Sequence, residues 1–352
     1  MKKLHRLVAL CQNAAIVFLF ALCLHLCACK FKAPTKNLVT YQDMVGRTVR
    51  IPSRPARIVS NGGAIDEWIL MLNAQDRLVS ISNSNQRRPW FRKVFPGAAT
   101  LPVAFDGSNV NIEELVSLKP DVVYMLSSVA SQTDVEHAGI PVFVFDRKDP
   151  RQMVAAVNLL AQTLGSEQEK IASQFNAYFD WSRKTVRNHM QGHAQKPLKV
   201  YYAAGANPLV TDGKDTLVDF WIHNTGDINL ASQHGIESRS KTITMEELLE
   251  WNPDVIVTST PLAVEAIRAD SRWLKINAVR NDRIYASPVG VYQWSTNTTE
   301  AAIQTLWIAT VLHPEQFRDV DMVKETQRFY HQFFRYDLTA TDALDILHPR
   351  AH

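Results

Sequence analysis

The stretch NIEELVSLKPDVVYM, residues 111–125, recurs 133 residues further on as TMEELLEWNPDVIVT, residues 244–258. Each copy begins with a residue suited to a helix N-cap, Asn111 or Thr244, and has Glu at the third helical position. In each copy a proline ends the helix and an apolar strand follows. Two unrelated units that share only capping chemistry would give some of this pattern. The common register over fifteen positions favours two similar units.

Apolar strands alternate with helical periodicity on both sides of these copies. The expected strands are 57–60, 77–82, 121–126, 141–146, 199–205, 254–259 and 283–287. Strands that are apolar along their whole length are typical of parallel sheets covered on both faces. The sequence therefore predicts an α/β fold of two similar lobes with mostly parallel sheets.

The residues between the two lobes have a helical pattern. A first helix follows Pro150 and ends at Gly165. A capping box formed by Ser166 and Glu169 is then expected to open a second helix that continues to His189. A helix of about 22 residues spans roughly 33 Å, which is enough to bridge two lobes.

The N-terminus has the pattern of an export signal. Lys2, Lys3 and Arg6 precede eleven apolar residues, 14–24, which is the length of a signal-peptide core and short for a membrane span. Leu26-Cys27-Ala28-Cys29 then has the form of a lipobox, which predicts cleavage before Cys29 and its lipidation. Ordinary secretion with cleavage nearby and an uncleaved anchor are the alternatives. All three place the body in the periplasm or on the outer face of the cell membrane.

These patterns divide the chain into six segments. They are a signal peptide (1–28), a tether (29–37), an N-terminal lobe (38–150), bridging helices (151–190), a C-terminal lobe (191–312) and a C-terminal helical extension (313–352).

The composition excludes several classes of function. Apolar residues make up 46% and charged residues 21%, which is ordinary for a globular protein. The net charge of +3 comes from the three basic residues of the signal peptide, so the body is neutral and nucleic acid is not an expected partner. All four cysteines lie within the first 29 residues, so the body has neither thiolate metal ligands nor a cysteine nucleophile.

Motifs of catalysis are absent from the sequence. It contains no GxSxG, Walker A or HExxH motif, and no GxGxxG after a strand. We therefore expect a binding protein that has no cofactor and is not an enzyme. An uncharacterised periplasmic hydrolase is the alternative of another class.

The chain resembles the class III substrate-binding proteins of ABC importers over about residues 40–315. The resemblance is carried by RTVRIPSRPARIVS, by the paired EEL…PDV units, and by NPLVTDGKDTLVDFWIHNTGDINLA at 207–231. It implies two lobes joined by one long helix, with a ligand cleft between them. It also implies delivery of the ligand to a permease dimer with ATPase subunits, by a protein that we expect to be a monomer.

The ligand is expected at the carboxyl ends of the parallel strands. The loops there contain arginines suited to anionic oxygens, and aromatic or polar side chains suited to flat ligands. The candidate ligand-binding residues are Arg87, Arg88, Trp90, Tyr202, Asn207, Tyr292 and Trp294. Solvated turns and core packing are the alternative interpretation of these residues. A metal chelate, and first among these a ferric siderophore, is the expected ligand, with vitamin B12 or another corrinoid, haem, a nickel or cobalt chelate, or an oxyanion as alternatives.

The resemblance also implies specific roles for two pairs of side chains. His234, which also counts as a ligand-binding candidate, and Tyr292 are predicted to complete the coordination of an incompletely wrapped Fe(III). A surface histidine and a packing tyrosine are the alternative. Glu113 and Glu246, at equivalent places in the two repeated units, are predicted to dock on arginines of the two permease subunits. A favourable interaction with the helix dipole is the alternative for each glutamate.

Overall fold

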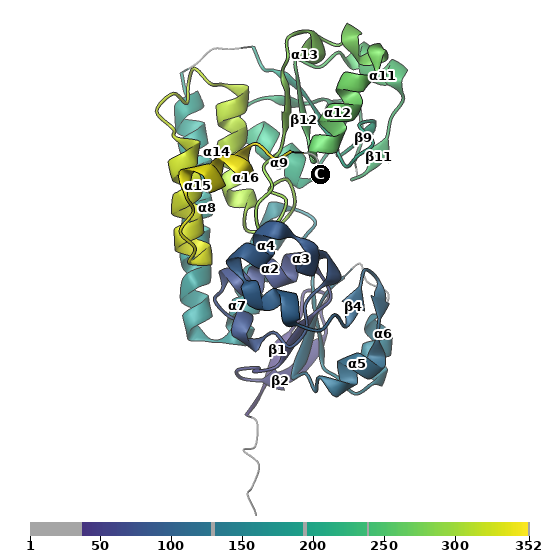
Figure 1. Ribbon diagram of the computed structural model, residues 1–352, viewed down its shortest axis with the longest axis vertical. Helices are drawn as coiled ribbons and strands as arrows, with labels where there is room; N and C mark the ends of the chain where they lie inside the picture. The colour runs from purple at the N-terminus through teal and green to yellow at the C-terminus, as the bar shows by residue number, and fades with distance from the viewer. Residues whose placement is uncertain (1–36, 128–130, 193–195, 238, 351–352) are drawn as a thin grey trace, which may run out of the picture. The chain divides into compact units, whose positions relative to one another are not determined.

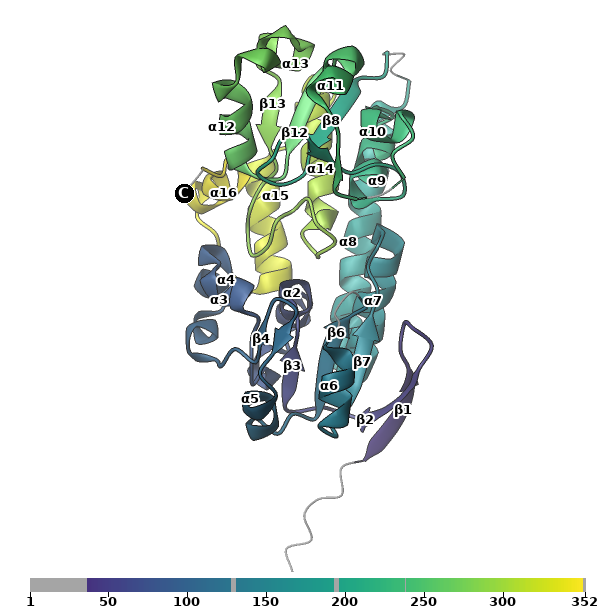
Figure 2. The same cartoon turned by 90° about the vertical axis from the view of Figure 1, so that its right-hand side faces the viewer.

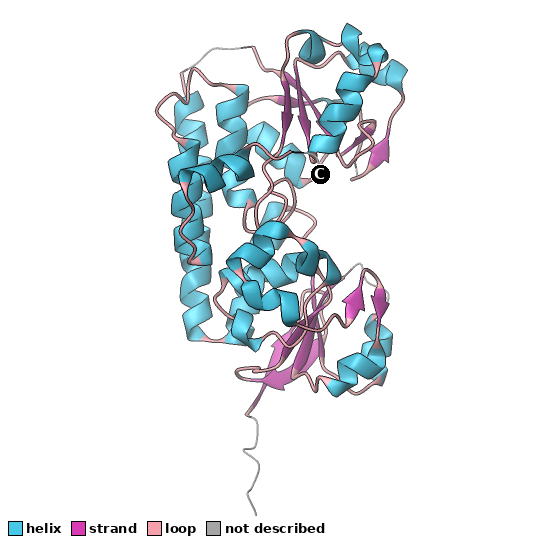
Figure 3. Cartoon of the chain, in the orientation of Figure 1, coloured by secondary structure: helices cyan, strands magenta, loops and turns pink. Residues whose placement is uncertain are grey.

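Two parallel sheets and the helices that cover them make up most of the computed structural model (Figures 1 and 3). The structure describes residues 37–127, 131–192, 196–237 and 239–350. Residues 38–352 form one compact unit. The expected signal peptide, Cys29 and nearly all of the tether lie outside the described residues. No helix among the described residues is long and apolar enough to cross a membrane. The α/β fold predicted from the sequence is confirmed.

The N-terminal lobe is built on three parallel strands in the order β3 (Ile58–Ser60), β6 (Val122–Leu126), β7 (Val142–Phe145). β3 and β7 are buried at every position, as their continuous apolar sequence requires. An antiparallel hairpin of β1 (Leu38–Gln42) and β2 (Thr48–Pro52) precedes them. The other elements of this lobe are α2 (Gly63–Met71), η1 (Gln75–Arg77), α3 (Asn83–Arg87), α4 (Pro89–Val94), η2 (Pro96–Thr100), β4 (Phe105–Asp106), β5 (Asn109–Val110), α5 (Ile112–Ser117) and α6 (Gln132–His137).

The C-terminal lobe has four parallel strands in the order β10 (Ile228–Asn229), β8 (Lys199–Ala203), β12 (Val255–Thr258), β13 (Ile284–Ala286). β12 pairs with a parallel strand on each side, as β6 does in the other lobe. The remaining elements are β9 (Val210–Thr211), α9 (Leu217–Asn224), α10 (Leu230–Gln233), β11 (Lys241–Thr242), α11 (Met245–Trp251), α12 (Pro261–Ala269), η3 (Ser271–Lys275) and α13 (Asn277–Arg280).

Long helices join the lobes. α7 (Pro150–Leu164) is followed after one residue by α8 (Ser166–Met190), and α8 runs along both lobes in Figures 1 and 2. α14 (Ala301–Leu312) packs against α8, followed by α15 (Met322–Phe329), the π-helical turn η4 (Tyr330–Phe334) and α16 (Ala340–Leu347). Aromatic contacts hold this C-terminal part to α8, including Phe175 with Phe333 at 5.9 Å between ring centroids.

The repeated units occupy equivalent places in the two lobes. α5 leads into β6 and α11 leads into β12, each the strand with parallel partners on both sides. The predicted capping box is complete on α11, where the Thr244 side chain and the Glu247 carboxylate each bond the other's backbone N–H. On α5 the Asn111 side chain accepts from the Glu114 N–H. Among the described residues, no bond runs from the Asn111 N–H to the Glu114 carboxylate.

Two local predictions are wrong. The strand expected over 77–82 is reduced to a bridge between Ile58 and Leu78, because Ser80 binds the Pro102 carbonyl and Ser82 caps α3 instead of continuing a ladder. Ser166 does not open a capping box. The single residue Gly165, with φ of 124°, makes the tight connection from α7, so Ser166 is already the first helical residue.

Candidate solute-binding cavity

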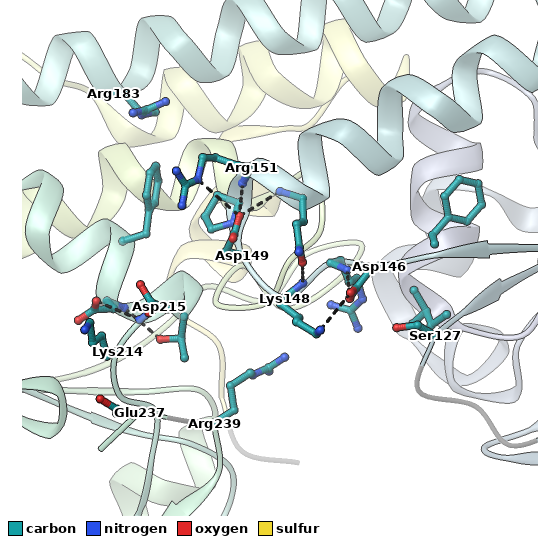
Figure 4. Close-up of a pocket in the computed structure, with 18 residues that line it drawn as sticks. Ser127, Asp146, Lys148, Asp149, Arg151, Arg183, Lys214, Asp215, Glu237 and Arg239 are labelled. Atoms are coloured by element: carbon teal, nitrogen blue, oxygen red, sulfur yellow. Dashed lines mark hydrogen bonds and ion pairs between the residues drawn. The ribbon is translucent and has the colours of Figure 1, made fainter. Parts of the chain in front are cut away.

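A cavity of about 980 Å³ lies at the carboxyl ends of β6 and β7 and extends to α8 and α9 (Figure 4). Its wall comes from both lobes and from the bridging helices. Six basic side chains line it: Arg147, Lys148, Arg151, Arg183, Lys214 and Arg239. The five acidic residues in the wall are Asp146, Asp149, Asp215, Asp219 and Glu237.

Three of these acidic side chains accept hydrogen bonds from other residues of the cavity wall or next to it. Asp149 caps α7 by accepting from the Arg151 and Gln152 N–H groups. Asp146 accepts from the Arg147 N–H and pairs with Lys148. Asp219 accepts from the Asp215 N–H and from Asn229. Lys148 and Arg151 are paired with two of these carboxylates, and the described wall has one basic side chain more than it has acidic ones.

Arg147 follows β7 and is half-buried. Its Nη1 donates to the Asn297 carbonyl at 3.3 Å, and its Nε has no hydrogen-bond partner among the described residues. Burial lowers its pKa, while the nearby Tyr292, Glu67 and Asp146 oppose that change. A guanidinium remains charged under these conditions, so this wall carries a fixed positive charge.

Arg239 comes from the opposite lobe. Figure 4 shows its side chain reaching into the cavity towards the strand end that carries Asp146 and Lys148. It contacts Asp212 with an Nε to Oδ2 distance of 3.6 Å and is half-exposed. Its positive charge contributes to the lowered pKa of Arg147. Arginines from two lobes therefore lie within electrostatic range of each other, an arrangement that an anion between them would stabilise.

Tyr292 lies beside this wall, in the segment between β13 and α14. The Arg88 guanidinium is 3.9 Å from the centre of its ring, a cation–π contact. The ring packs so closely on Gly63, at the start of α2, that a Cβ there would lie 2.8 Å from Tyr292 Cε2. The structure thus brings together two of the predicted ligand-binding residues, Arg88 and Tyr292.

Buried carboxyl groups lie on the other side of Tyr292. Glu67 on α2 accepts from the Thr299 N–H and hydroxyl, and Glu300 accepts from the Tyr292 N–H. Burial raises the pKa of Glu67 to about 8, with Glu300 as the second cause, and burial raises the pKa of Glu300 to about 7. Burial also raises the pKa of Asp66 to about 6, against hydrogen bonds from Ser60, Ser82 and Asn85.

The other predicted ligand-binding residues lie elsewhere. Trp294 is fully buried and donates to Glu300, and Tyr202 is buried against Trp221, so core packing accounts for both. Asn207 accepts from the Leu209 N–H in an exposed turn. Arg87 is exposed in the last turn of α3, and Trp90 lies beneath Lys93. None of the predicted ligand-binding residues is in the described wall of the large cavity.

The two proposed metal ligands have separate surroundings. His234 follows α10 and stacks on Trp251 at 4.6 Å between ring centroids, whereas Tyr292 lies between Arg88 and Gly63. Among the described residues no cluster of three or more metal-ligating side chains is present. The stacking of His234 explains its position by packing alone.

Sequence reasoning missed Arg147, Arg239 and the buried glutamates. Arg147 stands directly after the PVFVFD strand, at a carboxyl end where ligand residues are expected. Asp66 and Glu67 form an acidic pair inside the apolar helix AIDEWILM, an unusual position for two carboxylates. Arg239 had no comparable signal in the sequence.

The geometry of two α/β lobes around a charged cavity is accompanied by a match to a known family. The profile of the family described as "periplasmic binding protein" matches residues 58–289. The chain belongs to this family. As a periplasmic binding protein it is the solute-binding component of an ABC importer, and it is not an enzyme.

Relatives of this binding protein have different solutes in their names. The molybdate-binding protein MolA of Haemophilus influenzae is 25% identical over 87% of this chain and 93% of its own length. The cobalamin-binding protein of Halobacterium salinarum is 25% identical over 71% of this chain and 66% of its own length. Among solved structures, MolA with bound molybdate has a TM-score of 0.76 at 23% identity, covering 86% of this chain and 99% of MolA. That structural likeness shows the fold.

Proposed function

We propose that this binding protein captures an anionic metal-containing solute, and that an anionic metal chelate such as a ferric siderophore is that solute. The observation that carries the proposal is the pair of arginines, Arg147 and Arg239, which line one cavity from different lobes. Arginine matches carboxylate, catecholate and oxyanion oxygens through its planar set of donors. A volume of about 980 Å³ lies at the upper end of the range for small-molecule sites, so it can accommodate a chelate.

A metal oxyanion is the second candidate solute. The name of MolA, the relative matched over 93% of its length, favours it, and two arginines are also suited to a tetrahedral oxyanion. An oxyanion would bind between the arginines and leave most of the cavity to water. A corrinoid or haem has less support, because Trp294 and Tyr202 are buried and the aromatic residues of the described wall are the buried Phe145 and the partly buried Phe220.

The retained solute distinguishes these candidates. The protein is to be purified without denaturation from the periplasm of its native cells and examined by native mass spectrometry together with elemental analysis. The proposal predicts a bound organic chelate with about one metal atom per chain. Molybdenum or tungsten without an organic component would replace the first candidate by the second. A neutral organic solute without metal would contradict both.

Docking to the permease is proposed to use Glu113 and Glu246. Both are exposed in the first turn of their helices, α5 and α11, which occupy equivalent places in the two lobes. Neither side chain caps its helix: the N-cap side chains accept from the Glu114 and Glu247 N–H groups, and on α11 the Glu247 carboxylate also accepts from the Thr244 N–H. Two exposed carboxylates at matching positions suit a dimeric permease with one arginine site per subunit.

We further propose the six segments expected from the sequence, with cleavage before Cys29 and its lipidation, as the organisation of the exported protein. A monomer attached to the outer face of the membrane through two acyl chains would be stably anchored. Intact-mass measurement of the mature protein tests this, because a diacylglyceryl-modified Cys29 terminus has a mass that an unmodified chain lacks.

A further inference from the structure

The segment from Val289 to Glu300 is held by the C-terminal part of the chain. The Val289 N–H donates to the Ile346 carbonyl at 3.1 Å, and the Val291 N–H donates to the Tyr330 hydroxyl at 3.0 Å. Tyr330 in turn donates to Glu300 Oε1 at 2.5 Å. Residues of η4 and α16 thus fix backbone groups of the segment that carries Tyr292.

The Glu300 carboxylate accepts hydrogen bonds from several donors in and around this segment. Its Oε2 accepts from the Tyr292 N–H at 2.6 Å, and its Oε1 accepts from the Trp294 indole at 2.9 Å as well as from Tyr330. The arrangement leaves no spare room, because a Cβ on Gly290 would lie 1.9 Å from the Tyr330 hydroxyl. One buried carboxylate therefore orients the backbone on which Tyr292 stands.

The same segment holds the wall of the cavity. The Asn297 amide donates to the carbonyls of Arg147 at 2.6 Å and of Lys148 at 3.1 Å, and Arg147 returns a bond to the Asn297 carbonyl. Thr299, next to Glu300, donates to Glu67 on α2. Hydrogen bonds thus connect Tyr330 to Glu300, Glu300 to the backbone of the 289–300 segment, and Asn297 of that segment to Arg147.

We infer that Glu300 and Tyr330 are positioning residues for solute binding: together they hold the 289–300 segment, and with it Tyr292 and the Arg147 wall, in the geometry that receives the solute. This inference rests on the proposed function. It gives the C-terminal extension a part in the solute site, although none of its residues lines the described cavity wall.

The titratable groups around Glu300 make its hydrogen bonds to the 289–300 segment dependent on pH. Glu67 interacts with Glu300 from α2 and Tyr330 from η4, and the positive charge of Arg147 acts on Glu67. Asp66, the neighbour of Glu67 on α2, is bound by Ser60, Ser82 and Asn85. The Tyr330 hydrogen bond lowers the pKa of Glu300 against the larger effect of burial. Removing that hydroxyl therefore moves the titration of Glu300 to higher pH.

Tyr330→Phe tests the inference, with Tyr178→Phe as the matched control. Tyr178 also donates from a buried hydroxyl to a glutamate, Glu325 at 2.5 Å, but it does so from α8, and its ring contacts with Phe329 and Phe333 are kept when phenylalanine replaces it. Two readouts are compared in the full-length mature chain. The first is hydrogen exchange of the peptide covering 289–300 without solute. The second is affinity for a ferric catecholate complex and for molybdate between pH 5 and 9.

In Tyr330→Phe we expect faster exchange at 291 and 292, and affinity about fivefold to tenfold weaker at neutral pH. We also expect the pH at which affinity changes to rise. Tyr178→Phe should alter neither readout. Unchanged exchange in Tyr330→Phe, or equal effects of the two variants, would overturn the inference whatever the protein binds. If exchange accelerates while the wild type binds neither probe, the segment is positioned as described and the proposed solute class is wrong.

Discussion

The outer helices of the two lobes are near copies, whereas the surfaces that meet between the lobes are different. Outside, α5 and α11 have the same register, the same glutamates and an exposed first turn. Inside, the N-terminal lobe contributes Arg147 and the buried Glu67, and the other lobe contributes Arg239. A partner with two equivalent subunits requires repeated contacts, and a single asymmetric solute does not. The repeat is thus retained where a symmetric partner would bind and lost where the solute would bind.

The largest effect is expected from removing both outer glutamates. Glu113→Ala with Glu246→Ala should leave solute affinity and folding nearly intact, while stimulation of the transporter ATPase falls about tenfold or more, because charges at an interface rim set encounter and register. Reconstituted transporter in lipid discs gives the measurement. Glu167→Ala with Glu250→Ala removes two other exposed carboxylates and serves as control. Normal stimulation by the first double variant, or lost solute binding, would show that the glutamates are misassigned.

A smaller effect is expected from neutralising the buried acid between the lobes. The pKa of Glu67 is about 8 in the folded chain, above its ordinary value, so the folded state binds a proton more tightly than the unfolded state. The free energy of unfolding should therefore fall as pH rises from about 4.5 to about 8, and the Glu67 contribution to that fall is on the order of 5 kcal/mol. Glu67→Gln should make that fall smaller in urea titrations at a series of pH values, and the raised pKa values of Glu300 and Asp66 should account for the part that remains.

The exposed Glu265→Gln is the control for this comparison and should keep the wild-type slope. A Glu67→Gln profile that declines as steeply as the wild type would mean that Glu67 is not protonated in the folded state at neutral pH. The buried Glu67 would then not differ from the exposed glutamates in its protonation.

The smallest effect is a difference in stability loss between N-cap substitutions in the two repeated units. Thr244→Ala removes the hydroxyl's bonds to the Glu247 N–H and carboxylate but keeps the backbone N–H that donates to Glu247, and it should lower the free energy of unfolding by about 1–2 kcal/mol. Asn111→Ala removes one bond, to the Glu114 N–H, and should cost about 0.5–1 kcal/mol. Chemical denaturation of both variants gives the comparison. Equal losses would indicate that the additional bond from the Thr244 hydroxyl to the Glu247 carboxylate contributes nothing.

The fold was predictable because its signals are local and repeated. Continuous apolar strands such as PVFVFD and the punctuated helix–strand repeat specify buried parallel strands without reference to distant residues. The strand expected at 77–82 failed because serine hydroxyls formed bonds with Pro102 and with the start of α3. Such competition depends on partners that sequence periodicity does not reveal.

The cavity was less predictable, because it is assembled from residues distant in the sequence. The large cavity does lie at strand ends, yet aromatic content led to Trp294 and Tyr202, which the core buries. Arg239 and Arg147 are 92 positions apart and line the same cavity only in the folded chain. The likeness of Glu300 to an ordinary helix-start acid hid its role, since its partner Tyr330 follows thirty residues later.

The most direct test of the account is solute affinity in Arg147→Gln and Arg239→Gln, measured by titration calorimetry with a ferric catecholate complex and with molybdate at two salt concentrations. Arg268→Gln, which removes an exposed arginine paired with Asp282, is the control. Hydrogen bonds to a charged group predict that each cavity variant weakens binding of the recognised anion by about tenfold to a hundredfold. The double variant should also lose most of the salt dependence of the wild type. Wild-type affinity in both single variants would contradict capture of an anion between the lobes.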